Sequence, residues 1–346
     1  MRVFLTGAIG YIGSIIAHVL ISAGISVIGL DAGIFNQDCF SRGDAFASRA
    51  RMELLITKDV RDISVDDING CDAVIDFAGL ANDPTGELNP SWTDEINHRA
   101  SVRLAELARE TGVGRYIFAS SCSVYGKQSD TMLTEEAHLS PLSQYAKAKE
   151  AAEKEILALS TSEFHPTVLR NATAFGASPR MRLDLVINNL TASGYATGKI
   201  KVLSDGTSWR PNVHVEDIAG AVLACLQTDI AVTSGQIFNV GMTSENYQVR
   251  ELAKIVSELL HCDIEFAKNA AKDTRSYRVS FEKISKHLTS FRPKWTARMG
   301  IMELKEAFDR NCFDSKKFRL HAYYNIDTIK DRLESGEFDE TLRLKR

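Results

Sequence analysis

Two side chains that can move a proton stand four residues apart in this sequence. Tyr145 and Lys149 occupy positions i and i+4 of the segment YAKAK, so on a helix they share one face. An ammonium group favours the charged form of a neighbouring phenol and lowers its pKa from about 10. The pattern therefore predicts a general base at Tyr145. The segment 143–160 follows Pro141 and is rich in strong helix formers, so we expect it to be helical.

Three glycines at GxxGxxG spacing follow the first apolar run of the chain. Gly7 permits a tight turn, Gly10 lets the backbone approach a pyrophosphate, and Gly13 lets helix and strand pack closely. The N-terminus of the helix that follows offers free N–H groups to the phosphates. Asp31 ends the second apolar run, where a carboxylate accepts hydrogen bonds from a ribose 2′-OH and repels a 2′-phosphate. The spacing thus favours NAD over NADP, although Asp31 could also be an ordinary turn residue.

Several serines lie near the end of a later strand, in the segment FASSCSVYG (118–126). In a doubly wound sheet the carboxyl end of this strand should lie beside the nicotinamide of a bound dinucleotide. A serine there can hydrogen-bond a substrate hydroxyl and orient it towards Tyr145. An isolated YxxxK pair is common by chance and is then usually two solvated side chains. The serine-containing strand before it favours a catalytic role for Tyr145 and Lys149 instead.

Short β-branched runs alternate with helical stretches in the first half of the chain. This alternation predicts a parallel sheet with right-handed crossovers. The expected strands are 3–6, 26–30, 54–57, 73–77, 115–120 and 167–175, followed by 199–203 and 237–241 in the carboxy half. The expected helices are 11–23, 94–111, 143–160, 183–193, 215–226 and 249–260.

Composition excludes several classes of protein. Hydrophobic residues make up 44% and charged residues 25%, which is typical of globular proteins and not of disordered or fibrous ones. A formal charge of −4 provides no electrostatic footprint for nucleic acid or an anionic membrane. Six cysteines without a CxxC pair predict the reduced thiols of a cytoplasmic protein and no metal site. Glycines interrupt the uncharged run 3–30, so we interpret it as strand, turn, helix and strand, and not as a signal peptide or membrane span.

Together these motifs resemble the extended short-chain dehydrogenase/reductases, in the NAD-dependent epimerase/dehydratase family that acts on nucleotide sugars. The resemblance covers about residues 1–310, and its pieces occur in the family's order. They are TGAIGYIGS (6–14), LDAG (30–33), KDVRD (58–62), DFAGLA (76–81), Asn97, FASSCSVYG, YAKAK, LRNATAFG (169–176), WRPNVHVEDIA (209–219) and DTRSYRVS (273–280). The resemblance implies an α/β fold with a doubly wound parallel sheet of the Rossmann type and a smaller α+β substrate-binding lobe.

The resemblance also implies roles for individual residues. Ser121 would be the catalytic serine, Tyr145 the general base or acid, and Lys149 its electrostatic partner and a ribose ligand. The implied NAD-binding residues are Gly7, Gly10, Tyr11, Ile12, Gly13, Asp31, Asp59, Val60, Phe77, Ala78 and Gly79, together with Tyr145 and Lys149. The implied ligands of a nucleoside-diphosphate sugar are Ser121, Asn171, Arg180, Arg182, Arg210 and Arg275. Arginine neutralises a diphosphate bidentately, but each of these arginines could instead be a surface charge.

Two departures from the family pattern bear on the reaction. Family dehydratases carry an Asp–Glu pair directly after the catalytic Ser or Thr, whereas Cys122 and Ser123 stand at these positions. Some 3,5-epimerising relatives use a cysteine two residues before the tyrosine that corresponds to Tyr125, and that position is Ser123. We therefore interpret Cys122 as a packing thiol that points to the opposite face of the strand. We expect His214 to be a structural hydrogen-bonding residue.

These observations predict an NAD-dependent nucleotide-sugar epimerase that acts at C4. Tyr145 would remove the proton of the 4-hydroxyl while NAD takes up a hydride, and the keto-sugar would turn and regain the hydride on its other face. The segment ASPRMRLDLVINNL (177–190) resembles a subgroup that includes heptose-nucleotide 4-dehydrogenases, so a net 4-dehydrogenase or ketoreductase is the alternative. A dehydratase is less well supported. The retention of Ser121, Tyr145 and Lys149 disfavours a non-catalytic dinucleotide-sensing scaffold.

We expect residues 1–170 to form the NAD-binding domain and 171–313 a substrate-binding lobe interleaved with the sheet. The charged tail 314–346 is surplus to the family pattern, and 325–336 within it could form an amphipathic helix. The loop NDPTGELNP (82–90) follows the fourth strand and should close over the sugar. Relatives usually dimerise through two helices per subunit, so we expect a homodimer built on the helices 94–111 and 143–160.

Overall fold

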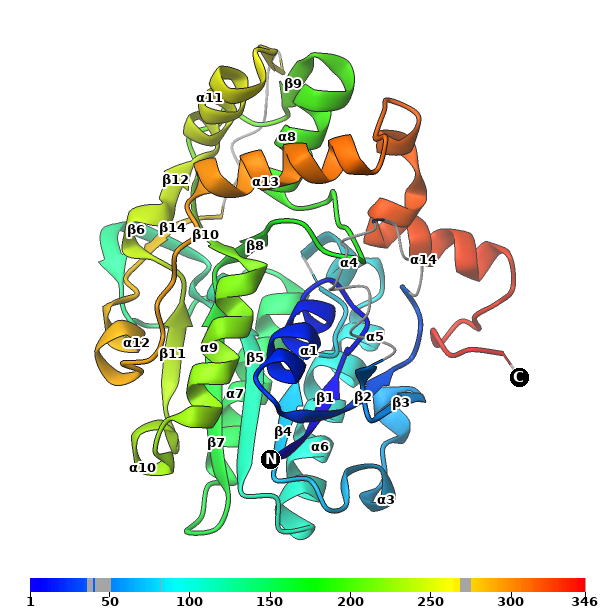
Figure 1. Ribbon diagram of the computed structural model, residues 1–346, viewed down its shortest axis with the longest axis vertical. Helices are drawn as coiled ribbons and strands as arrows, with labels where there is room; N and C mark the ends of the chain where they lie inside the picture. Colours follow the sequence, from blue (N-terminus) through cyan, green and yellow to red (C-terminus); the bar gives the residue numbers. More distant parts are fainter. Residues whose placement is uncertain (36–39, 41–50, 82, 268–274, 346) are drawn as a thin grey trace.

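Seven parallel strands form the central sheet of the computed structural model, which describes residues 1–35, 40, 51–81, 83–267 and 275–345 (Figure 1). Their order is β11-β7-β5-β4-β1-β2-β3. The strands are β1 (Arg2–Thr6), β2 (Ser26–Asp31), β3 (Leu54–Thr57), β4 (Ala73–Asp76), β5 (Arg115–Ser121), β7 (His165–Asn171) and β11 (Ile237–Val240). The order reverses between β1 and β4, and this is the place where open α/β sheets bind their ligands. The predicted doubly wound sheet is confirmed.

Helices cover both faces of this sheet because the strands are apolar on both sides. The helices α1 (Gly13–Ser22) and α9 (Val215–Gln227) pack on one face, in a core that contains Val3 and Leu5. The helices α6 (Ala100–Glu110) and α7 (Gln144–Ala158) cover the other, in a second core that contains Phe4. Successive residues of β1 thus face opposite cores, as the two-residue period of a strand requires.

The predicted strand 167–175 is in fact two strands. β7 ends at Asn171, and β8 (Thr173–Phe175) pairs with β10 (Trp209–His214) outside the central sheet. Strand-forming residues lie on both sides of Arg170 and Asn171, so the sequence pattern does not show that the strand partner changes at Ala172. The split matters because it leaves Asn171 at the carboxyl edge of the sheet, in register with Ser121.

A third core holds together the smaller lobe above this edge. It is built from α8 (Val186–Thr197), α11 (Val249–Leu260) and α13 (Ala297–Arg310). Short strands complete the lobe: β6 (Lys127–Leu133) pairs with β14 (Ser276–Val279), β9 (Lys199–Val202) with β13 (Asp263–Phe266), and β12 (Asn246–Gln248) with β10.

Short helices occur in both halves of the described chain. They are α3 (Val65–Ile68), α4 (Asp83–Leu88), α5 (Pro90–Asp94), α10 (Ile230–Thr233) and α12 (Glu282–His287). The expected helix 183–193 starts later, at Val186, and the helix α13 was not predicted.

The charged tail is packed against the body of the protein. Its helix α14 (Asn325–Glu334) lies within the amphipathic segment predicted at 325–336. Ile329, Phe338 and Leu342 are almost fully buried in the same core as α6 and α7. In the described part of the chain, no helix has both the length and the apolar character to cross a membrane.

Candidate active site

The glycine turn after β1 is shaped by close backbone contacts. Gly7 has φ +66°, and a Cβ atom there would lie 2.8 Å from the carbonyl oxygen of Phe77. A Cβ atom on Gly13 would lie 2.0 Å from the carbonyl oxygen of Gly7. Only glycine accommodates both the positive φ and these approaches. The helix α1 that follows has no side-chain cap at Ile12, and its first residue, Gly13, lines the cleft. The N-terminal end of α1 therefore suits the phosphates of a dinucleotide.

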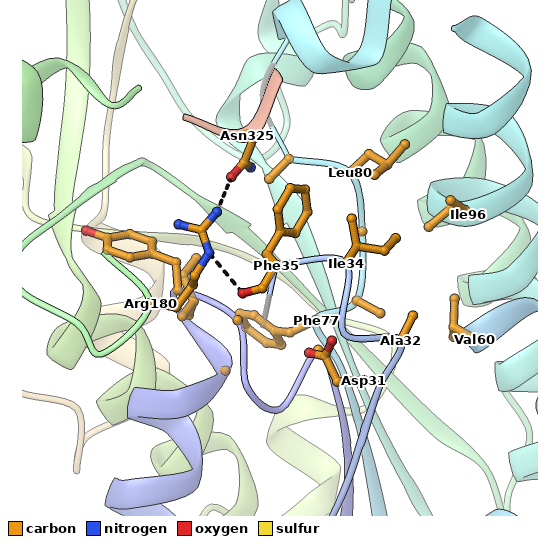
Figure 2. A pocket seen from close by; sticks show the side chains of 18 of the residues that line it. Asp31, Ala32, Ile34, Phe35, Val60, Phe77, Leu80, Ile96, Arg180 and Asn325 are labelled. Carbon is orange, nitrogen blue, oxygen red and sulfur yellow. Dashed lines mark hydrogen bonds between the residues drawn. The ribbon is translucent and has the colours of Figure 1, made fainter. Parts of the chain in front are cut away.

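Asp31 stands at the carboxyl end of β2, where its carboxylate is held by two backbone amides. Oδ1 accepts from Gly33 N at 2.8 Å and Oδ2 from Ile9 N at 3.3 Å. Figure 2 shows Asp31 beside Ala32 and Ile34, with Val60 across the pocket from them. A fixed carboxylate next to an apolar slot fits the ribose and adenine of NAD.

One cleft contains most of the residues predicted to bind NAD. Gly7, Gly10, Tyr11, Ile12, Gly13, Asp31, Asp59, Val60, Phe77, Ala78 and Gly79 all line it. Asp59 is fixed by Arg61, whose Nε and Nη2 donate to the two carboxylate oxygens at 3.0 and 2.6 Å. Tyr145 and Lys149 are not among the residues that line this cleft.

The predicted catalytic residues meet where β5 ends and α7 begins. Ser121 is the last residue of β5, and its hydroxyl accepts from Ser123 N at 3.1 Å. The N-cap Ser143 starts α7 by accepting from Ala146 N at 3.2 Å, which places Tyr145 in the first turn. The side chain of Ser121 faces that of Tyr145 closely enough to act on the phenol and lower its pKa. The fold therefore brings together Ser121 and Tyr145, the two residues that the sequence predicts to act on one substrate hydroxyl.

The electrostatics of Tyr145 differ from the sequence-based expectation. Burial raises the pKa of Tyr145 to about 12, with a further rise from Asp83, while the side chain of Ser121 and the charge of Arg182 act in the opposite direction. Burial lowers the pKa of Lys149 to about 8, against the effects of Asp76 and Glu153. The expectation that Lys149 brings the pKa of Tyr145 below its usual value is thus wrong. The reason is that loss of hydration outweighs the neighbouring charges on both groups.

A buried ion pair fixes α7 to the sheet. Glu153, one turn beyond Lys149, accepts from Arg170 of β7 through both oxygens, at 3.0 Å from Nε and 2.7 Å from Nη2. Both side chains are at most 3% exposed. The hydroxyl of Ser120, next to Ser121 in β5, also donates to Glu153. This network ties the strand that carries the serine to the helix that carries the tyrosine and lysine.

Asp83 is a site residue that the sequence reasoning did not single out. It begins α4, forms an ion pair with Arg275, and accepts a hydrogen bond from the hydroxyl of Ser143. A Cβ atom on Gly86 would lie 3.0 Å from Cβ of Tyr145, so α4 packs directly on the tyrosine that we predict to be catalytic. The loop 82–90 was expected to close over the sugar, and residue 82 lies outside the described residues. The sequence feature that could have identified Asp83 is its position as a carboxylate shortly after the fourth strand.

Two of the predicted substrate arginines are adjacent. Nη1 of Arg210 donates to the carbonyl of Arg275 and, at 2.8 Å, to that of Trp209. The guanidinium of Arg210 also lies 6.0 Å from the ring centre of Tyr277. Asn171 lies at the sheet edge with its amide nitrogen 3.2 Å from the carbonyl of Ser120. Its Oδ1 is buried without a hydrogen-bond partner among the described residues, which suits a ligand hydroxyl.

The other two predicted substrate arginines lie on the cofactor side, where they line the cleft. Arg182 binds Asp184 through two hydrogen bonds of 2.9 and 3.1 Å and lies 5.9 Å from the ring centre of Tyr11. Arg180 is fully buried and donates to the carbonyl of Phe35 at 3.0 Å. Its position therefore favours a role at the cofactor cleft over the predicted contact with the substrate.

Cys122 and His214 have the structural roles that the sequence indicated. Cys122 is 1% exposed, and its thiol donates to the carbonyl of Arg170 at 3.2 Å. Burial raises the pKa of this thiol far above its usual value. His214 is fully buried and pairs with Glu303 through Nε2 at 2.8 Å. Asn97 exchanges two hydrogen bonds with the backbone of Leu80, so it has a structural role as well.

Comparison with protein families gives a match to the NAD dependent epimerase/dehydratase family over residues 3–241. This match spans more than half of the chain. The chain belongs to the NAD dependent epimerase/dehydratase family. NAD is accordingly its cofactor, in agreement with the geometry of the cleft.

Relatives of this family member include sugar-nucleotide enzymes. It is 27% identical over 327 residues to a UDP-glucose 4-epimerase of Bacillus subtilis strain 168, with 88% of this chain and 94% of the relative covered. It is also 27% identical over 318 residues to UDP-glucuronic acid decarboxylase 1 of Arabidopsis thaliana, covering 89% and 70%. Among solved structures, MoeE5 in complex with UDP-glucuronic acid and NAD superimposes with a TM-score of 0.77 at 26% identity, covering 90% of this chain and 99% of that one.

Proposed function

We propose that this protein is an NAD-dependent epimerase that inverts C4 of a UDP-sugar. The observation that carries the proposal is the placement of Ser121, at the carboxyl end of β5, beside Tyr145 in the first turn of α7. Two relatives support the substrate class, since a UDP-glucose 4-epimerase and MoeE5 with UDP-glucuronic acid are both similar over most of the chain. NAD, when bound, supplies reversible two-electron oxidation of a sugar carbinol.

The side chains of the site divide the remaining work. Ser121 orients the 4-hydroxyl, and Tyr145 takes its proton and later returns it. The buried ammonium of Lys149 stabilises negative charge near the ribose and phenol. Arg210 and Arg275 provide the positive charge for the diphosphate, while the unpartnered Oδ1 of Asn171 accepts from a hydroxyl of the ligand.

The residues after Ser121 favour epimerisation over dehydration. Elimination of water needs an acid and a base beside the sugar, and the family places an Asp–Glu pair there. Here Cys122 is buried with a raised pKa and a backbone hydrogen bond, and Ser123 is not ionisable. The two residues that stand where dehydratases carry Asp and Glu therefore supply neither the acid nor the base.

The experiment is a turnover assay on UDP-glucose, UDP-galactose and UDP-glucuronic acid, read by NMR at C4. We expect interconversion of the C4 epimers without net change in absorbance at 340 nm. Accumulation of NADH and a keto-sugar would instead support a net 4-dehydrogenase. Loss of water with no epimer would support a dehydratase. Tyr145→Phe should lower the turnover rate by about 10³-fold or more, while the variant still binds NAD.

We also propose that the protein is a cytoplasmic homodimer that pairs through α6 and α7. These helices lie side by side on one face of the sheet (Figure 1). Sedimentation equilibrium should give twice the chain mass of 38.2 kDa, and a monomeric mass at micromolar concentration would exclude this assembly.

A further inference from the structure

The C-terminal segment 325–345 lies along the cofactor cleft, although nothing in the family pattern accounts for it. Its first residue, Asn325, is 3% exposed and lines the cleft. Oδ1 of Asn325 accepts from Nη2 of Arg180 at 3.1 Å, while Nε of Arg180 donates to the carbonyl of Phe35 (Figure 2). The loop after β2, the segment around Arg180 and the start of α14 therefore meet at the wall of one pocket.

A second attachment joins α14 to the loop that carries the ribose-binding carboxylate. Nη1 of Arg332, which is 8% exposed, donates to the carbonyl of Gly33 at 2.9 Å. The backbone N–H of Gly33 in turn donates to Oδ1 of Asp31 at 2.8 Å. One residue thus connects the tail to Asp31, the group that selects NAD over NADP.

A third attachment lies at the adenine end of the cleft. Arg61, which holds Asp59, also donates from Nη1 to the carbonyl of Thr341 at 2.8 Å and from Nη2 to that of Leu342 at 3.1 Å. Farther along, Nε1 of Trp92 donates to the carbonyl of Glu340 at 2.9 Å.

Apolar packing reinforces these bonds. Ile329, Phe338 and Leu342 belong to the same buried cluster as Val60 and Ile96, which line the cleft. Removal of these apolar side chains from water holds the tail in place, so the tail is a stable part of the cleft wall. Movement of the tail would disturb the pocket residues that it contacts.

We propose that the segment 325–345 is a cofactor-binding element, in which Asn325, with Arg180, contacts NAD and Arg332 positions the Asp31 loop over its adenosine half. The tail thereby slows the departure of NAD between turnovers. The inference depends on NAD as the cofactor and extends the proposed function, because an epimerase restores its cofactor in each cycle and has no need to exchange it.

The test is the binding of NAD to the full-length protein, without any sugar. For Asn325→Ala and Arg332→Met we expect Kd to rise about tenfold, with a matching rise in the dissociation rate measured by dilution into excess competitor. Lys330→Ala changes an exposed residue of the same helix and should stay within twofold of the parent. ADP-ribose should lose affinity to the same extent as NAD. Unchanged constants in both folded variants, or an effect on NAD that ADP-ribose does not share, would overturn the proposal.

Hydrogen–deuterium exchange provides a second readout that needs no substitution. Adding NAD to the parent protein should slow exchange in α14 and in residues 338–345. Exchange there that is indifferent to saturating NAD would also overturn the inference. Because no sugar is present in either experiment, their outcome is separate from the assay of C4 epimerisation: NAD binding can depend on the tail even if the substrate is a different sugar.

Discussion

The carboxylate of Asp83 forms an ion pair with the guanidinium of Arg275, which lies 192 residues later in the chain. The pair joins α4, which packs on Tyr145, to the residue that directly precedes β14 in the smaller lobe. It therefore links the proton-transfer group to a predicted ligand of the diphosphate. Binding of a diphosphate at Arg275 would compete with Asp83 for the same cation.

Replacing Arg275 should weaken substrate binding more than catalysis. Arg275→Met removes a cation that we assign to the diphosphate, so we expect KM for the UDP-sugar to rise about 10- to 100-fold, with kcat within about fivefold of the parent. Steady-state kinetics at saturating NAD would measure both constants. Arg310→Met, at an exposed residue of α13, is the matched control and should change neither.

Neutralising Asp83 should shift the pH dependence of turnover. Asp83 raises the pKa of Tyr145, and Asp83→Asn removes that charge, so the pKa of Tyr145 should fall. Activity that needs the phenolate would then persist to lower pH, and the acid limb of the kcat profile should move to lower pH. A limb that stays in place or moves up would contradict this role. Glu106→Gln, exposed on α6, serves as the control.

Breaking the buried pair of Arg170 and Glu153 should destabilise the fold strongly. Glu153→Gln leaves a buried guanidinium without its counter-charge, and we expect a loss of about 3–5 kcal/mol in the free energy of unfolding. The exposed pair of Glu150 and Lys154 offers the comparison, because Glu150→Gln should cost about 1 kcal/mol or less. Urea denaturation followed by circular dichroism would separate the two values, and similar losses would argue against the buried network.

The contribution of His98 to stability should depend on pH. Burial alone lowers the pKa of His98, but its hydrogen bonds to Asp94 and to Glu155 of α7 raise it overall above 6.5. The folded protein therefore holds this proton more tightly than the unfolded chain. The stabilisation is complete below the unfolded-state pKa and is lost as the pH rises through the folded-state pKa. His98→Gln should lower Tm at pH 5.5 and have a smaller effect at pH 8.5, and equal losses at both pH values would contradict this linkage.

Adding one methyl group to the glycine turn should impair NAD binding. In Gly13→Ala the new Cβ would lie 2.0 Å from the carbonyl oxygen of Gly7, so the turn must open where the pyrophosphate binds. We expect at least a tenfold rise in the Kd for NAD, measured by calorimetry. At Gly114 an added Cβ meets nothing within 4 Å, so Gly114→Ala should bind NAD as the parent does.

The sequence by itself determined the elements and the local chemistry of the cofactor half. Alternating apolar runs predicted six of the seven central strands, β11 among them, at nearly their observed bounds. The glycine turn, Asp31 and the i, i+4 pair of Tyr145 and Lys149 depend on short-range spacing, and short-range spacing is what a single sequence records. The same reasoning merged β7 with β8, because strand-forming residues occur throughout 167–175 and do not show that the two strands have different partners.

Only the tertiary structure decided the long-range relationships. The pairing of Asp83 with Arg275, the placement of Arg180 at the cofactor cleft, and the attachment of the tail through Asn325 and Arg332 each join segments far apart in the chain. The raised pKa of Tyr145 is likewise a consequence of burial. Contacts between distant segments and the exclusion of water arise from packing the whole chain, so no local pattern of residues specifies them.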